Sequence, residues 1–370
     1  MKFPEDSEKF KNYILKIIEP IHSPNDKRIS DEYFFGSQRS EAGRRLPPYY
    51  LVYFLFVDLL KFKDLGRSEK TAWSIPIEYN GKIFLISYRK MGLGVFIHDV
   101  NTEEKEAQEI VKKIKKAIMK AEPYFDFIAE STVNNSKVNV INNSSHLYKR
   151  YIFLLKEYKK RATKIKNKIF DFKKQEKANW LALATIDAFY SWTEHVFVHI
   201  AIITGKIHTG KEVVDFAAEE WKDKYKLALE LSTKESIIYF DKLVSIKSQL
   251  RNYYAHGAFG KEGEAFKFHS ATGAVPVQIN RYKKSKKYSL YGPQGFSESD
   301  AIQTIDSFIK FMWTGKLLPA KMYIQESDLS TVLPFSSDGT YSKAMRSAKD
   351  MKQLIDIMIR NSDKAADMDW

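Results

Sequence analysis

The sequence predicts a mostly helical α+β fold with two main parts. Over residues 1–130, apolar and polar residues alternate on either side of the tight-turn pair Asn80-Gly81, which predicts a small antiparallel sheet. From residue 146 onwards, apolar residues recur every three or four positions, which predicts a helical bundle. Alternation returns over 258–296, where we expect a β-hairpin inserted into the bundle. The expected order is therefore an N-terminal α+β domain followed by the bundle.

The N-terminal domain, residues 1–130, is expected to have a sensing or recruiting role. Its predicted elements are helices over 6–18, 49–60 and 102–120 and strands over 73–77, 83–88 and 94–98. Asn101 and Glu104 have the spacing of a capping box, which is typical of the start of a helix. Residues 131–145 are rich in Asn and Ser, which oppose regular structure, so they are the predicted linker.

The bundle is predicted to occupy residues 146–315. Its expected helices cover 147–172, 179–204, 211–231, 232–257 and 297–314, and Ser232 with Glu235 forms the pattern of a second capping box. Helix 179–204 is apolar on every side except at a few polar residues, so it is expected to be the central and most buried helix. Residues 316–370 are predicted to be a C-terminal extension with one helix, over 342–360.

Composition excludes several classes of chemistry. The chain has no cysteine, which excludes disulfides, thiolate metal sites and cysteine nucleophiles. Residues 1–12 lack the apolar core of a signal peptide, and the run 49–60 is shorter than the about 20 residues that cross a bilayer. We therefore expect a soluble, cytoplasmic protein with no membrane partner.

The net charge of +14 is concentrated in the middle of the chain. Residues 141–296 carry 28 Lys and Arg against 15 Asp and Glu. Basic clusters near aromatic residues attract a polyanion through counterion release and base stacking, although a lysine-rich helix can also be a solvated surface. The residues predicted to bind RNA are Lys159, Lys160, Arg161 and Lys164 in one cluster and Arg281, Lys283, Lys284, Lys286 and Lys287 in the other.

One motif in the bundle region carries acid–base chemistry. At the end of predicted helix 232–257 the sequence reads Gln-Leu-Arg251-Asn252-Tyr-Tyr-Ala-His256-Gly257. This resembles the Arg-x(4–6)-His signature of the HEPN superfamily of helical-bundle ribonucleases and RNA-binding domains. The Asn after Arg251, the Ala-His-Gly ending, the apolar helix before it and the helix after it agree with the resemblance, which covers about 146–315. HEPN nucleases usually bring two motifs to one cleft, so the resemblance implies a homodimer.

The residue types suit cleavage of RNA without a metal or cofactor. Such a reaction removes the proton of the 2′-hydroxyl, protonates the leaving 5′-oxygen and stabilises a phosphorane. His256 titrates near neutral pH and is the candidate acid or base, while Arg251 offers a permanently charged, planar set of donors to the scissile phosphate. Asn252 could orient His256 or a phosphate oxygen. Either Asp187 or Glu194 could pair with Arg251, and we favour Glu194 as its positioning partner.

Three alternatives stay open at this point. Some HEPN domains bind RNA or dimerise without cutting, and a helical interaction protein would ignore RNA altogether. His195 and His199 have the i, i+4 spacing of a zinc-binding pair, but no third ligand is evident, so a pair of histidines satisfied inside the bundle is the favoured interpretation. The resemblance also implies a toxin or antiphage role, in which an antitoxin or another regulatory protein would be a partner.

Overall fold

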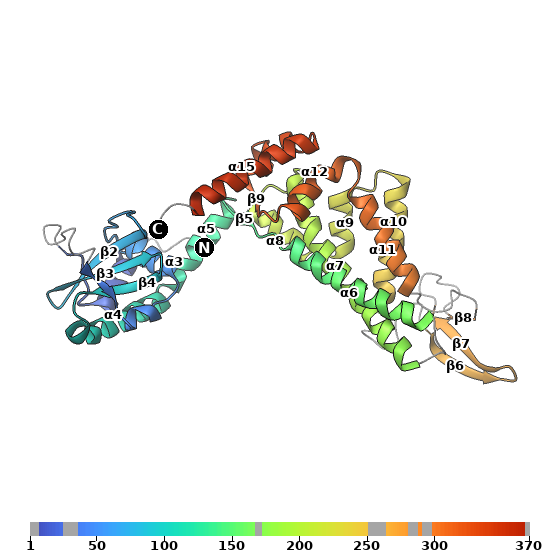
Figure 1. Ribbon diagram of the computed structural model, residues 1–370, viewed down its shortest axis with the longest axis horizontal. Coiled ribbons are helices and arrows are strands. Elements are labelled where there is room, and N and C mark those ends of the chain that lie inside the picture. The colour runs from blue at the N-terminus through green and yellow to red at the C-terminus, as the bar shows by residue number, and fades with distance from the viewer. Residues whose placement is uncertain are drawn as a thin grey trace. The chain divides into compact units, whose positions relative to one another are not determined.

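The computed structural model describes residues 7–24, 36–166, 172–250, 264–279, 288–290 and 298–366 (Figure 1). It is a mostly helical α+β protein with a small antiparallel sheet, as predicted. The chain divides into two compact units, Met1–Thr132 with Arg360–Trp370 (unit 1) and Val133–Ile359 (unit 2). The division falls in segment 131–145, which holds the end of α5 (Glu122–Asn134), strand β5 (Asn139–Val140) and the start of α6 (Ser144–Lys166).

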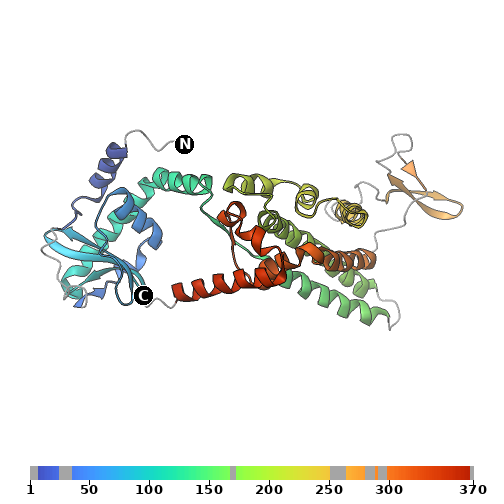
Figure 2. The same ribbon diagram turned by 90° about the horizontal axis from the view of Figure 1, so that it is seen from above.

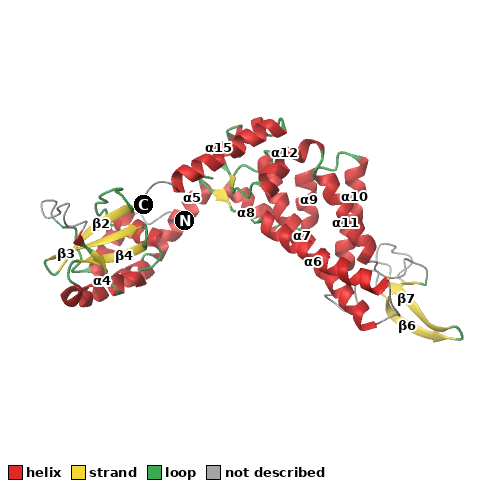
Figure 3. Cartoon of the chain, viewed as in Figure 1, coloured by secondary structure: helices red, strands yellow, loops and turns green. Residues whose placement is uncertain are grey.

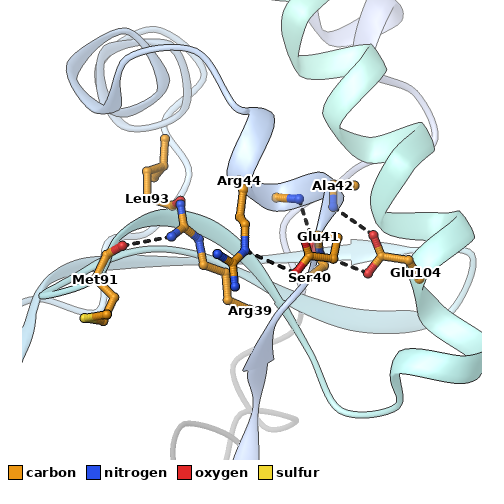
Figure 4. Close-up of polar contacts among 9 residues, drawn as sticks. Arg39, Ser40, Glu41, Ala42, Arg44, Met91, Leu93 and Glu104 are labelled. Atoms are coloured by element: carbon orange, nitrogen blue, oxygen red, sulfur yellow. Dashed lines mark hydrogen bonds and ion pairs between the residues drawn. The ribbon is translucent and has the colours of Figure 1, made fainter.

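Unit 1 contains a four-stranded antiparallel sheet in the order β1-β4-β3-β2. The predicted strands are β2 (Thr71–Tyr79), β3 (Lys82–Arg89) and β4 (Gly92–Ile97). Asn80 and Gly81 join β2 to β3 with φ values of 50° and 78°, which a two-residue hairpin turn requires. The sequence did not predict β1 (Gln38–Arg39), because it has only two residues. The Arg39 guanidinium fixes β1 by donating to the carbonyl of Met91 at 2.8 Å and to that of Leu93 (Figure 4).

Helices cover the sheet and enclose the core of unit 1 (Figure 2). They are α1 (Ser7–Ile18), the 3-10 helix η2 (Ala42–Arg45), α3 (Tyr49–Tyr53), the π-helical turn η3 (Phe54–Leu59) and α4 (Val100–Lys120), while α5 adds only the partly buried Tyr124 and Phe125 at its start. Ile14, Phe56, Phe84 and Ile110 are fully buried where these helices meet the strands. The apolar run 49–60 is helical, as predicted, but Tyr49 and Tyr50 at its start are exposed and its second half is wound as a π-helix.

The predicted capping box of Asn101 and Glu104 is wrong. The N-cap of α4 is Asp99, whose carboxylate accepts from the backbone N–H of Asn101 at 2.9 Å. Glu103 accepts from the backbone N–H of Asp99 and completes the cap. Glu104 instead accepts from the backbone N–H of Ala42 at 2.8 Å and so joins α4 to η2 (Figure 4). This partner lies 62 residues away, so local spacing could not reveal it.

Unit 2 is a helical bundle around α7 (Figure 3). Its main helices are α6, α7 (Phe172–Ile203), α8 (Gly210–Ala218), α9 (Trp221–Leu229), α10 (Lys234–Leu250) and α11 (Glu298–Met312). Phe189, Trp192 and Phe197 of α7 are fully buried, which confirms that α7 is the central helix. The single helix predicted over 211–231 is two helices, because the backbone is extended at Glu219 and Glu220.

The start of α10 also differs from the prediction. Ser232 and Glu235 do not form its cap; Thr233 and Ser236 do. The hydroxyl of Thr233 accepts from the backbone N–H of Ser236 at 3.1 Å, and the hydroxyl of Ser236 accepts from the backbone N–H of Thr233 at 3.2 Å. The two capping candidates are one residue apart, and only the backbone geometry separates them.

The predicted β-hairpin insertion lies between α10 and α11 (Figure 3). It consists of β6 (Glu264–Ser270) and β7 (Gly273–Ile279), with β8 (Tyr288–Ser289) paired to β7.

The C-terminal segment contains more structure than the one helix predicted. Its elements are η5 (Gly315–Leu317), α12 (Leu318–Lys321), η6 (Met322–Glu326), β9 (Thr331–Val332), α13 (Pro334–Ser337), α14 (Thr340–Ala344) and α15 (Ala348–Ala366). β9 pairs with β5, and the indole of Trp192 donates to Gln325 at 3.0 Å. The part of this segment up to Ile359 therefore belongs to the core of unit 2.

Candidate functional site

The motif Arg251, Asn252 and His256 lies outside the described residues, directly after α10. The cluster of predicted RNA-binding residues Arg281, Lys283, Lys284, Lys286 and Lys287 also lies outside them. The described part of the candidate site is therefore the frame that leads to the motif, namely α10 and the helices packed against it.

Two hydroxyl groups hold α10 in the bundle. The hydroxyl of Tyr190, on α7, donates to the backbone carbonyl of Leu243 at 2.7 Å. The hydroxyl of Tyr225, on α9, donates to the backbone carbonyl of Ser236 at 3.1 Å. Burial raises the pKa of both tyrosines, so both hydroxyls stay protonated and can donate. The helix that precedes Arg251 is thus fixed near its start and at its middle.

Glu194 of α7 has an ion-pair partner that the sequence did not predict. Its Oε1 lies 3.0 Å from Nζ of Lys247 on α10, and both side chains are 38% exposed. The Lys247 ammonium also lies 5.0 Å from the centre of the Tyr190 ring. Lys247 precedes Arg251 by four residues in the sequence, so the carboxylate that we expected to meet Arg251 is paired instead with a lysine within α10.

Two features of the sequence bear on this ion pair. The sequence has a lysine four residues before Arg251, so Lys247 could have been considered as a partner for a carboxylate. Local spacing does not show that the partner comes from α7. Asp187, the other candidate partner of Arg251, is exposed on α7.

The basic cluster of α6 lies at the surface. Lys159, Lys160 and Arg161 are all exposed, and Lys159 pairs with Asp306 of α11 at 3.2 Å. Lys164 lies in α6, but its side chain is outside the described residues. Lys160 and Arg161 make no ion pair with another described residue, so they are available to an anionic ligand.

Two exposed aromatic residues near these cations were missed in the sequence. Phe153 of α6 is 63% exposed and Trp180 of α7 is 57% exposed. Each lies three or four residues from a lysine on the same helix, a spacing that puts both side chains on one face, and this spacing could have identified both residues. The amphipathic pattern alone assigns large apolar residues to the core, so it overlooked both.

His195 and His199 are joined inside unit 2. Their Nε2 atoms are 3.0 Å apart, and Nδ1 of His199 is 2.6 Å from the hydroxyl of Thr331. Burial lowers the pKa of both rings, that of His199 to about 3, to which the neighbouring His195 also contributes. Within the described ranges, no three or more His, Asp or Glu side chains are grouped so that they could hold a metal ion. The geometry agrees with the favoured interpretation of a satisfied pair.

Comparison with known proteins identifies no relative. No protein-family model matches the chain, and no curated protein and no solved structure is significantly similar to it. Among the residues that the structure describes, no helix has both the length and the apolar character to cross a membrane.

Proposed function

We propose that this chain is a metal-independent endoribonuclease, with Arg251, Asn252 and His256 at its active site. The observation that carries the proposal is the Arg251–His256 motif, which directly follows α10 in the sequence, and α10 itself is anchored to α7 and α9 by buried hydroxyls. The exposed cations of α6 supply a surface for the polyanionic substrate in the same unit.

The proposed reaction needs only these side chains and the RNA. The 2′-oxygen attacks the adjacent phosphorus while its proton passes to a base, and the 5′-oxygen leaves with a proton from an acid. The products are a 2′,3′-cyclic phosphate and a 5′-hydroxyl. His256 transfers protons, and the Arg251 guanidinium stabilises the growing charge on the phosphorane oxygens. Asn252 orients the imidazole or a phosphate oxygen.

The proposal includes a homodimer. One imidazole cannot serve as base and acid at the same moment, so two copies of the motif at one cleft would supply both groups. A nuclease of this kind harms its own cell unless it is controlled, so a toxin or antiphage effector in the cytoplasm, with an antitoxin or regulatory protein as partner, is the proposed setting.

The decisive experiment incubates the full-length protein with a defined RNA in EDTA. Wild type is compared with Arg251→Ala and His256→Ala, and with Arg45→Ala and His146→Ala as matched controls at exposed positions outside the motif. We expect either motif substitution to slow cleavage by about 10²- to 10⁴-fold, and the controls to cut as wild type does. Products should carry 2′,3′-cyclic phosphates, and an RNA with 2′-deoxy substitution should resist cleavage.

An alternative function is a non-catalytic HEPN-like RNA-binding or dimerisation scaffold. It is favoured by the cations of α6 that have no acidic partner among the described residues, because these serve RNA binding without any cutting. Salt-sensitive binding of RNA with no cleavage by wild type would support the scaffold. Cleavage that persists in both Arg251→Ala and His256→Ala would overturn the proposed active site.

A further inference from the structure

The exposed face of α6 carries an aromatic ring among lysines. Lys149, Phe153, Lys156 and Lys160 follow one another at intervals of four, three and four residues, so they lie within a sector of about 60° around the helix. All four side chains are exposed, Phe153 by 63%. The group, referred to below as the α6 row, extends over about 16 Å along the helix.

The positive charge of the α6 row is not compensated by its surroundings in the described structure. Glu157 is the single acidic residue in the sequence of α6; it borders the row, about 40° from Phe153 around the helix, and makes no ion pair with Lys160, which follows it by three residues. None of the three lysines of the row has an ion pair with another described residue. Lys159, just beside the row, does have one, to Asp306. The row therefore presents three positive charges and one apolar ring to solvent.

The exposed face of α7 repeats this combination. Lys173, Lys177 and Trp180 are spaced by four and three residues and are all exposed, Trp180 by 57%. Glu176 lies beside them, so this face is less strongly basic than the α6 row. A large ring flanked by lysines thus occurs on two consecutive helices of one unit.

The chemistry of the row selects one partner. Lysines bind phosphates, and a solvent-exposed ring stacks on a nucleic-acid base whose face is free. Bases in a duplex are already stacked on each other, whereas bases of a single strand offer their faces. We propose that the α6 row binds single-stranded RNA, with the Phe153 ring stacked on a base and with Lys149, Lys156 and Lys160 on the phosphates. The choice of RNA rests on the proposed function.

The test measures binding in the absence of cleavage. Full-length protein carrying His256→Ala is titrated into a fluorescently labelled single-stranded RNA of mixed sequence and, separately, into a blunt RNA duplex. In this background, Phe153→Ala is compared with Phe153→Tyr, which keeps a ring. The double substitution Lys156→Gln/Lys160→Gln is compared with Lys211→Gln/Lys352→Gln. The second pair removes the same charge from exposed positions elsewhere in unit 2.

We expect Phe153→Ala to weaken the binding of single-stranded RNA by roughly tenfold, Phe153→Tyr to restore it, and duplex binding to stay unchanged. The substitution Lys156→Gln/Lys160→Gln should lower the slope of log affinity against log salt by about 1.4, and the control pair should leave that slope at its wild-type value. The proposal would be overturned if the protein with both His256→Ala and Phe153→Ala bound single-stranded RNA as tightly as the protein with His256→Ala alone. It would also be overturned by a loss of dimer mass in Phe153→Ala without a change in RNA affinity, which would make the row a contact between copies of the chain.

The result of this binding test does not depend on whether the chain cleaves RNA. Binding that depends on Phe153 would stand even if wild type cuts no RNA. Conversely, cleavage that depends on Arg251 and His256, together with binding that ignores Phe153, would uphold the nuclease and reject the α6 row.

Discussion

Nε2 of His199 lies 3.0 Å from Nε2 of His195, and this contact fixes the protonation of both rings. The backbone N–H of Asn143 donates to the same nitrogen of His195 at 2.8 Å, so that nitrogen carries no proton. Nε2 of His199 is therefore the donor of the pair, and its Nδ1 accepts from the hydroxyl of Thr331. Both histidines are neutral in the folded protein, and they tie α7 to β9 and to the segment before α6.

The neutral pair predicts that unit 2 loses stability in acid. The folded pKa of His199, about 3, lies below the unfolded value of about 6.5, so the unfolded chain takes up the proton first. The stabilisation is complete above pH 6.5 and is lost as the pH falls toward 3. Between pH 7.5 and pH 5 we expect the free energy of unfolding in urea to fall by about 2 kcal/mol from this residue.

The matching controls are His199→Gln and His146→Gln. The first variant should be less stable at pH 7.5 but should show a smaller loss on acidification, because the titrating ring is gone. The second removes an exposed histidine from α6 and should follow wild type at every pH. If wild type and His199→Gln lost equal stability between pH 7.5 and pH 5, the neutral pair would not be the cause.

The pattern of apolar residues predicted the helices and strands well, but it did not predict which side chains contact each other across the fold. The helices of unit 2 and the strands β2, β3 and β4 follow from periodicity, which is a local property. Glu104 was assigned to a local cap, yet its carboxylate binds the backbone of η2, 62 residues away. Gln325 was placed outside the bundle, yet it accepts from Trp192, 133 residues away. Contacts of this kind depend on how elements meet in space, and a single sequence does not contain that information in its spacing.

The candidate site shows the same limit. The motif was visible because its three residues are close in sequence. Lys247, the partner of Glu194, lies on another helix 53 residues later, and the choice among several cations could not be made from the sequence. The pairing of Glu194 with Arg251 stays a prediction.

Glu194 is predicted to act on cleavage through the cations of α10. In Glu194→Gln the carboxylate that neutralises Lys247, four residues before Arg251 in the sequence, is lost, so we expect the cleavage rate to fall roughly tenfold, equivalent to about 1.4 kcal/mol of transition-state stabilisation. Glu194→Asp should recover part of the rate, and the effect should fall on kcat rather than KM. The measurement is single-turnover cleavage of the defined RNA.

The control for Glu194 is a second ion pair of the same unit, between Lys159 and Asp306. Asp306→Asn removes the charge that pairs with Lys159 at a comparable distance, 3.2 Å, and keeps an amide oxygen that can still accept from the hydroxyl of Tyr151, which donates to Asp306 at 2.9 Å. Since half-exposed pairs contribute about 1 kcal/mol or less, both variants should unfold at similar urea concentrations. A rate loss of equal size in Asp306→Asn would mean that charge in general, and not the position of Glu194, governs cleavage.

Gly43 is predicted to be required for the close packing of η2 against β4 in unit 1. A Cβ at this position would lie 2.9 Å from the carbonyl oxygen of Val95 and 2.8 Å from the hydroxyl of Ser40, because η2 passes directly over β4. Gly43→Ala should destabilise unit 1 by roughly 1–3 kcal/mol through overpacking. Hydrogen exchange of peptides from β3 and β4 would report the loss. Gly36→Ala, where the nearest atom of His98 is 3.6 Å away, should exchange as wild type does, and equal protection in both variants would contradict the close approach.

Tyr341 is predicted to hold the C-terminal segment in the core of unit 2. Its hydroxyl accepts from the backbone N–H of Val332 at 2.8 Å and donates to the hydroxyl of Tyr323 at 3.3 Å, which donates in turn to the carbonyl of Ser330 at 2.9 Å. Tyr341→Phe leaves the part-buried N–H of Val332 without its acceptor, so the free energy of unfolding should fall by about 1–3 kcal/mol.

The control for this chain of hydroxyls is Tyr148→Phe. Tyr148 packs against Trp192, and its hydroxyl makes no hydrogen bond to another described residue, so its loss should change stability by less than that of Tyr341. Urea unfolding followed by tryptophan fluorescence measures both, because Trp192 and Trp313 lie in the affected core. If Tyr341→Phe were as stable as wild type, the chain of hydroxyls would not be what holds this segment in the core. If the loss is as large as expected, the proposed cleavage and the proposed RNA binding have to be tested in a chain that retains the segment, because its side chains complete the core of unit 2.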